Sequence, residues 1–301
     1  MKKFTNKNNR SLSLQYALAI GGIALLILLG SYYNSVNKES IEDAETEDEA
    51  ISLEEQVLSK DGITLPISWG NLGSQMIEVG VIDAPRFEAI YTSRGGFSEE
   101  DKKLVYGNNE EIIMTRENAG LLLNLFWAFG LSNENVVLEE GEMTDKRYGG
   151  DAGQFASTGG WSLSVDHPMN HYSKHTFVSL TKKQQQKVEN VAKGIYRPCC
   201  GNSTYFPDCN HGMAMLGLLE LMAAEEMSEE DMFEVALQVN SYWFPETYLT
   251  LATYFESQGT LWNEVNPKVA LSEEYSSARG YQRVLQELKP VDFQGGSGCS
   301  V

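Results

Sequence analysis

Apolar residues recur at helical spacing through most of residues 62–288, and the alternation typical of strands is scarce. The clearest helix spans residues 115–129, where an apolar run ends in aromatic residues and is closed by Gly130. Residues 212–224 form a second helix whose one charged residue is Glu220, so almost no polar face remains. The pattern predicts a mainly α-helical domain with this second helix buried in its core.

Helix-start signals divide the remaining sequence. Ser98 with Asp101, and Thr181 with Gln184, have the spacing of capping boxes, and Ser228 precedes three acidic residues. Further helices are predicted over residues 69–79, 84–91, 181–195, 228–242, 246–258 and 272–288. The glycine-rich residues 148–162 match neither the phosphate-loop nor the dinucleotide-binding pattern, so they are interpreted as an irregular loop covering the site described below.

An uncharged run over residues 11–37 is long enough to cross a bilayer. Four basic residues precede it, which predicts a cytoplasmic N-terminus and an extracytoplasmic domain. A cleaved signal peptide is the alternative. The anchor is favoured because the apolar run is longer than the core of a signal peptide and no clear small-x-small cleavage site follows.

These patterns predict five segments. They are a cytoplasmic basic end (1–10), a transmembrane helix (11–37), an acidic tether (38–61), an α-helical Cys/His domain (62–289) and a flexible tail (290–301). Within the tether, residues 39–55 contain nine acidic residues and no basic one, which favours a solvated, self-repelling spacer.

The formal charge of −19 and the sequence pI of about 4.6 restrict the class of partner. Nucleic-acid binding requires a basic footprint, and an anionic lipid surface attracts basic segments. Neither partner is predicted for the domain, and the membrane is predicted as a partner only through residues 11–37.

Seven of the eight cysteines and histidines lie within residues 167–211, a window of 45 residues. They are His167, His171, His175, Cys199, Cys200, Cys209 and His211, whereas Cys299 lies in the tail. Such clustering of thiol and imidazole groups is typical of a metal or redox site. It is the strongest functional signal in the sequence.

The cysteines occupy a loop over residues 198–211, directly before the buried helix. Asp208 or Asn210 is a candidate cap for that helix, and Cys209 would lie near its positive end, which favours the thiolate. Cys199, Cys200, Cys209 and His211 are candidate metal ligands. Copper is favoured because thiolate and imidazole, with a thioether at Met213 or Met215, form a soft ligand set, although core packing is the commoner role of methionine. Zinc is the second choice, because Cys3His is an accepted zinc set but the usual CxxC spacing is absent.

His171 and His175 are four residues apart and would share one face of a helix, as in metal-binding helix pairs. His167 is four residues earlier, but Pro168 limits a helix there to its first turn. We therefore predict that His171 and His175 add ligands to the cysteine site. Single histidines are more often surface or core residues, and that alternative stays open.

Two other functions fit the same cysteines. Cys209 with Cys199 or Cys200 could form a disulfide that cycles, because a thiol at a helix N-terminus is acidified. The same bridge could instead be a structural link in an interaction protein. Whether the protein is an enzyme stays undecided at this point.

The order of residues around the loop resembles membrane-anchored thiol proteins of cytochrome c maturation. Arg197-Pro-Cys199-Cys200 is followed by Asp208-Cys-Asn210, a helix and Ser228-Glu-Glu230, over about fifty residues. The family has Cys-x-x-Cys where this chain has Cys-Cys, and Cys209 and His211 are additional. The resemblance implies thiol or metal handling outside the membrane. Covalent haem is not expected, since there is no CxxCH.

Overall fold

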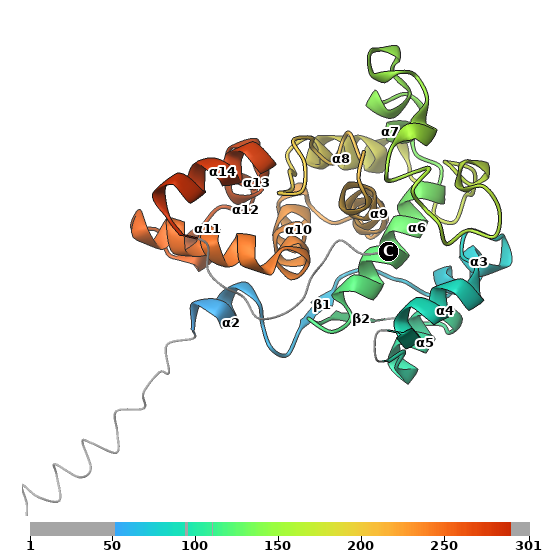
Figure 1. Ribbon diagram of the computed structural model, residues 1–301, viewed down its shortest axis with the longest axis horizontal. Coiled ribbons are helices and arrows are strands. Elements are labelled where there is room, and N and C mark those ends of the chain that lie inside the picture. Colours follow the sequence, from blue (N-terminus) through green and yellow to red (C-terminus); the bar gives the residue numbers. More distant parts are fainter. Residues whose placement is uncertain (1–51, 94–95, 110, 290–301) are drawn as a thin grey trace, which may run out of the picture. The chain divides into compact units, whose positions relative to one another are not determined.

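The computed structural model describes residues 52–93, 96–109 and 111–289 (Figure 1). The predicted basic end, membrane span and flexible tail, and most of the tether, lie outside these residues. Within them, no helix has the length and apolar character needed to cross a bilayer.

The described residues are mainly helical, as predicted. The α-helices are α2 (Leu53–Val57), α3 (Leu72–Glu78), α4 (Ala84–Ser93), α5 (Glu99–Tyr106), α6 (Ala119–Ser132), α7 (Val136–Glu139), α8 (Lys182–Ala192), α9 (Asn210–Ala224), α10 (Glu229–Trp243), α11 (Pro245–Ser257), α12 (Pro267–Ala270), α13 (Glu273–Ser276) and α14 (Ala278–Glu287). Short 3-10 helices are η1 (Glu142–Thr144), η2 (Lys146–Tyr148), η3 (Ala152–Gln154), η4 (Pro168–Asn170) and η5 (Trp262–Glu264). Two strands, β1 (Ile63–Leu65) and β2 (Ile112–Met114), pair antiparallel with Thr64 opposite Ile113.

The core is built around the crossing of α6 and α9, near the centre of Figure 1. Both helices are buried along nearly their whole length, as their apolar sequences predict. They approach so closely because glycines meet at the crossing. A Cβ on Gly130 would lie 2.3 Å from the Met213 carbonyl oxygen, and one on Gly217 would lie 2.6 Å from the Phe126 oxygen. Substitution at either glycine would therefore separate the two backbones.

Other helices enclose this pair. Helix α8 packs against α9, and α10 contacts α8, α11 and α12. Helices α3 and α5 pack together on the side of α6 opposite α8 (Figure 1). The predicted caps are confirmed at three starts: Ser98 and Thr181 each form a capping box, and the Ser228 side chain accepts from Asp231 N.

The folded region begins earlier than Gly62, where the domain was predicted to start. Helix α2 lies in the predicted tether and packs against α11. Val57 is 5% exposed and Leu58 is fully buried, so the apolar residues at the end of the acidic segment contribute to the core. The sequence prediction missed this short helix because the acidic residues around it indicated a solvated spacer.

The predicted helix over residues 272–288 is divided into α13 and α14. Ser277 has extended backbone between them, and its side chain accepts from the backbone N–H of Gly280, which caps α14. The two short helices touch through Gly280, whose Cβ would lie 2.4 Å from the Glu273 carbonyl oxygen. The chain therefore forms two short helices instead of one continuous helix. The Ser277 cap starts the second helix, and Gly280 allows the two to pack closely.

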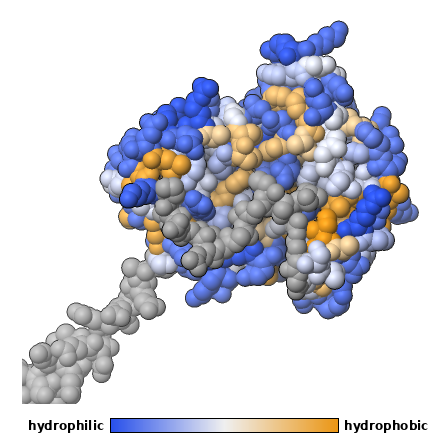
Figure 2. Space-filling model, in the orientation of Figure 1, coloured by the Kyte–Doolittle hydropathy of each residue, from blue (hydrophilic) through white to orange (hydrophobic). Residues whose placement is uncertain are grey.

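The face shown in Figure 2 is mostly hydrophilic, with separate hydrophobic areas. Large apolar side chains that are exposed include Val79, Ile113, Val165 and Leu261. They come from different elements, and exposed apolar residues are normal on protein surfaces.

Candidate metal centre

The buried side chain of Arg197 holds the cysteine loop through hydrogen bonds to several of its oxygen atoms. Its guanidinium, 1% exposed, donates to the carbonyl oxygens of Asn202 (3.0 Å) and Phe206 (3.2 Å) and to Asp208 Oδ1 (2.7 Å). Its Nε lies 3.0 Å from Cys209 Sγ. A planar guanidinium with fixed donors suits this role, because it satisfies several loop groups at once. Sequence reasoning placed Arg197 in a motif but missed this function.

Gly212 makes room for Arg197 in the first turn of α9. A Cβ at that position would lie 2.5 Å from Cζ of Arg197, far closer than side chains approach. The loop, the arginine and the helix start therefore form one packed unit, and the glycine is required by a close approach.

The glycine-rich residues 148–162 pack against this unit, but many of them are exposed and they contain the short helix η3, so the predicted buried irregular loop is confirmed only in its contact with the site. The backbone N–H of Ser157 donates to the Asp208 carbonyl oxygen (3.2 Å). The backbone carbonyl oxygen of Ser157 in turn accepts from Trp127 Nε1 of α6 (2.6 Å). Phe155 packs edge-on against Phe206 at 5.3 Å between ring centroids. These contacts connect the cysteine loop to the central helix α6.

Cys209 is itself the N-cap residue of α9, and its side chain makes no capping hydrogen bond. Asp208 does not cap the helix, because its carboxylate pairs with Arg197 instead. Asn210 is the first residue of α9, and its Oδ1 accepts from the backbone N–H of His211 (2.9 Å), so the expected contribution of Asn210 to the helix start is confirmed in part. Cys209 Sγ lies 3.5 Å from Cys199 Sγ. Cys199, Cys200 and Cys209 are all free thiols, and Cys199 is exposed.

Hydrogen bonds from Cys199 and Cys200, followed by the charge of Arg197, hold the pKa of the Cys209 thiol well below its usual value. The pKa of Cys199 is raised by its hydrogen bonds to Cys200 and Cys209. A single negative charge is therefore concentrated on Cys209, next to a permanent cation. A thiolate is the form of cysteine that binds metals or attacks electrophiles.

His211 lies one turn into α9 and is 3% exposed. Its Nδ1 is 3.0 Å from Asn210 Oδ1, which is an acceptor, so Nδ1 carries a proton. The ring packs against Phe244 at 4.4 Å between centroids, and it also hydrogen-bonds to Cys209. The imidazole is thus held in a fixed orientation beside the thiolate.

Two groups of three potential ligands meet here. The ligand atoms of Cys199, Cys209 and His211 lie within 4.8 Å of one another, and so do those of Cys200, Asp208 and Cys209. A metal ion can be held by such a group. Asp208 is poorly placed as a ligand, because Oδ1 accepts from Arg197 and Oδ2 accepts from Asn202 (2.9 Å). The available donors are therefore sulfur and imidazole.

The predicted helix containing His171 and His175 does not form. Pro168 starts the three-residue helix η4, and turns follow it. His171 Nδ1 faces His175 Nε2 at 3.0 Å, and neither residue belongs to the two ligand groups at Cys209. Met213 and Met215, which were considered as thioether ligands, are 0% and 1% exposed and belong to the hydrophobic core.

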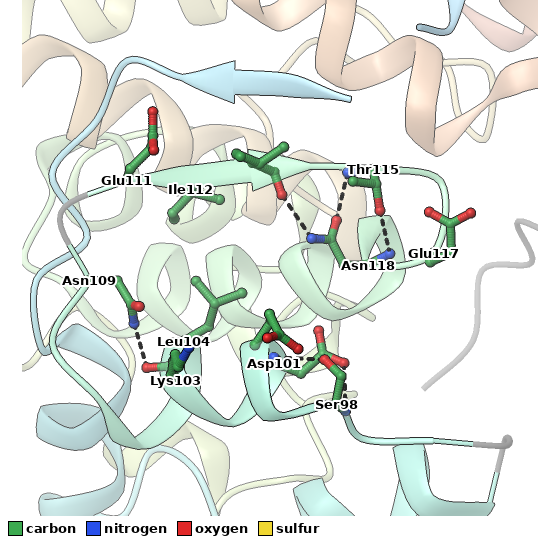
Figure 3. Close-up of a pocket in the computed structure, with 12 residues that line it drawn as sticks. Ser98, Asp101, Lys103, Leu104, Asn109, Glu111, Ile112, Thr115, Glu117 and Asn118 are labelled. Atoms are coloured by element: carbon green, nitrogen blue, oxygen red, sulfur yellow. Dashed lines mark hydrogen bonds between the residues drawn. The ribbon is translucent and has the colours of Figure 1, made fainter. Parts of the chain in front are cut away.

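A separate pocket of about 530 Å³ lies between α5 and β2 (Figure 3). Several of its polar side chains form hydrogen bonds with nearby backbone groups. Asn118 accepts from the N–H of Thr115 and donates to the Ile113 carbonyl oxygen, both at 2.8 Å, and Asp101 completes the capping box of α5. None of its lining residues is a predicted ligand, and the pocket supports no specific chemistry.

Comparisons of the chain with models of known protein families, with curated proteins and with solved structures gave no match. The similarity to thiol proteins of cytochrome c maturation therefore rests on the local residue pattern alone.

Proposed function

We propose that this protein binds a soft or borderline metal ion, copper or zinc, through Cys199, Cys200, Cys209 and His211. The observation that carries the proposal is the approach of the Cys199, Cys209 and His211 ligand atoms to within 4.8 Å of one another. Sulfur and imidazole are the donors that select copper(I) and zinc among common biological metals.

Copper is the first choice on ligand type. Two thiols and an imidazole meet directly, whereas the nearest carboxylate is occupied by Arg197 and Asn202. Zinc would take four ligands and would need Cys200 to turn toward the same ion, completing a Cys3His set. Cys200 already contacts Asp208 Oδ1 at 3.8 Å, in the group that shares Cys209.

The proposed location is extracytoplasmic. The uncharged run over residues 11–37 would anchor the protein in the membrane, with basic residues on the cytoplasmic side and the acidic segment leading to the domain. In such a compartment the site would hold metal ions at the membrane surface.

A thiol–disulfide function is the second candidate. The 3.5 Å distance between Cys199 Sγ and Cys209 Sγ makes these two cysteines the candidate pair, and the acidified Cys209 thiol would be its attacking group. The pair would cycle by thiolate attack on a partner disulfide. If the disulfide did not cycle, it would only stabilise the loop, and the protein would be an interaction protein with a structural disulfide.

One experiment separates these functions. The full-length protein is purified without chelators and without oxygen, and metal content and free thiols are measured on the same sample. We expect one copper or zinc ion per chain and no bridge among the loop cysteines. A metal-free protein with a Cys199–Cys209 bridge would replace metal binding by one of the two disulfide functions.

A further inference from the structure

Cys199 and Cys209 are two free thiols whose sulfur atoms lie 3.5 Å apart. Cys209 is half-buried at the start of α9, whereas Cys199 is exposed and lies in a turn of the preceding loop. The two sulfur atoms of a disulfide are about 2.05 Å apart, so these thiols need to approach by about 1.5 Å to form one. A movement of the exposed turn by this amount would bridge them.

The same two sulfur atoms belong to the candidate metal centre. Together with His211 they form a group whose ligand atoms lie within 4.8 Å of one another. Cysteine binds metals as the thiolate, and a disulfide has no thiolate. A bridge between Cys199 and Cys209 consequently removes two of the three donors and leaves one imidazole. An ion bound to both thiolates in turn keeps them from attacking a disulfide.

Arg197 favours the reduced form of this pair. Its Nε lies 3.0 Å from Cys209 Sγ, and its guanidinium is 1% exposed. Such a charge-assisted contact is strong for a thiolate, and it is lost when the sulfur becomes neutral in a disulfide. A disulfide whose reduced form is stabilised is more easily reduced. A bridge formed here is therefore reversible by thiol reductants, and the buried cation keeps its carboxylate partner Asp208 in either state.

We propose that a reversible Cys199–Cys209 disulfide controls whether the site holds its ion, which rests on the metal binding proposed for the same residues. The oxidant is a small-molecule disulfide. The Cys209 thiolate attacks one sulfur of the oxidant and displaces the other sulfur as a thiolate. The Cys199 thiolate then attacks Cys209 Sγ and displaces the second thiolate. Two electrons pass from the pair to the oxidant, and the ion leaves with its charge unchanged.

The metal-binding and disulfide chemistries are then two states of one site. In the reduced state both sulfur atoms are thiolates and hold the ion beside His211. In the oxidised state the sulfur atoms are bonded to each other and the ion is released. Thiol reductants return the protein to the first state.

The test uses the full-length protein, loaded with Zn²⁺ or Cu⁺ in the absence of oxygen and dialysed to remove excess ion. Oxidised glutathione is added, and bound metal, free thiols and bridged peptides are measured on the same samples over time. We expect loss of the bound ion together with two thiols per chain, at the same rate, with Cys199 and Cys209 joined. Treatment with dithiothreitol, followed by its removal, should restore both thiols and the capacity to bind one ion.

Cys299→Ser is the matched control, because it removes the one thiol outside the loop. It should form the bridge and lose the ion at the rate of the parent. An ion that stays bound after the Cys199–Cys209 bridge has formed, or that is lost without this bridge, would overturn the redox control and leave metal binding intact. A protein that holds no ion before oxidised glutathione is added would overturn metal binding itself, and the redox control with it.

Discussion

The guanidinium Nε of Arg197 lies 3.0 Å from the sulfur of Cys209, and the same side chain binds Asp208 at 2.7 Å. The buried guanidinium of Arg197 thus contacts the side chains of two consecutive residues, the carboxylate of Asp208 and the sulfur of Cys209. The cysteine loop depends on this side chain for both its shape and its charge distribution.

Replacing Arg197 by methionine should lower the free energy of unfolding by about 3–5 kcal/mol, because removing one partner of a buried ion pair leaves the other charge uncompensated. Arg197→Lys should recover only part of the loss, since a lysine cannot reproduce the fixed fork of donors. Urea unfolding of the metal-free proteins checks both changes. Equal stability of the methionine variant and the parent would show that Arg197 does not support the loop.

Gly212→Ala should destabilise the protein by about 1–3 kcal/mol, because the new methyl group overlaps the Arg197 guanidinium and forces it to move. Gly120→Ala in α6 is the matched control. No atom lies within 4 Å of the position of its Cβ, so alanine should be neutral or stabilising by up to about 1 kcal/mol. The midpoint temperature of thermal unfolding should therefore fall for Gly212→Ala and stay the same or rise for Gly120→Ala. Equal changes in the two midpoints would contradict the packing argument.

Glu220 makes stability depend on pH. Burial raises the pKa of this fully buried carboxyl well above its usual value, and the hydrogen bond from Asn133 (2.6 Å) opposes the shift only in part. The folded protein therefore keeps a proton that the unfolded chain loses above about pH 4.5. Stability from this group is complete below that pH and falls as pH rises toward the folded pKa, by about 1.4 kcal/mol per pH unit.

Glu220→Gln removes this dependence and retains an acceptor for Asn133. Its free energy of unfolding should be close to that of the parent at pH 4 and should exceed it by a growing margin toward neutral pH. Urea unfolding at several pH values measures the margin. A constant difference across the range would mean that Glu220 is ionised in the folded protein.

The topology of the chain is a separate prediction. A reporter that is active only in the cytoplasm, fused after Val301, should be silent, because the positive residues precede the uncharged run. The same reporter fused at the N-terminus should be active and serves as the control. Activity of the C-terminal fusion would exclude an extracytoplasmic domain.

Local signals in the sequence predicted the elements that local chemistry determines. The caps at Ser98, Thr181 and Ser228 and the buried helix α9 are examples, since each follows from residues within a few positions of one another. The proximity of Cys209 to the start of α9 was predicted in the same way.

The remaining features depend on contacts that no short window contains. The buried role of Arg197 requires Gly212 and three loop acceptors to meet around it. His171 was assigned to a helix on spacing alone, whereas Asp166 and His175 hold it in a turn. Helix α2 was hidden because acidic residues surround the two apolar side chains that pack against the core.

The central claim is that Cys209 and His211 hold a metal ion, and the most direct test is metal content per chain across single variants of the full-length protein. Cys209→Ser and His211→Ala should each lose the ion, and protons should displace it from the parent as pH falls, because they compete for thiolate and imidazole. Cys299→Ser should retain it, and so should His171→Ala, which lies outside the ligand groups. Full metal content in Cys209→Ser, with loss in His171→Ala, would contradict the account and assign the metal to the histidines alone.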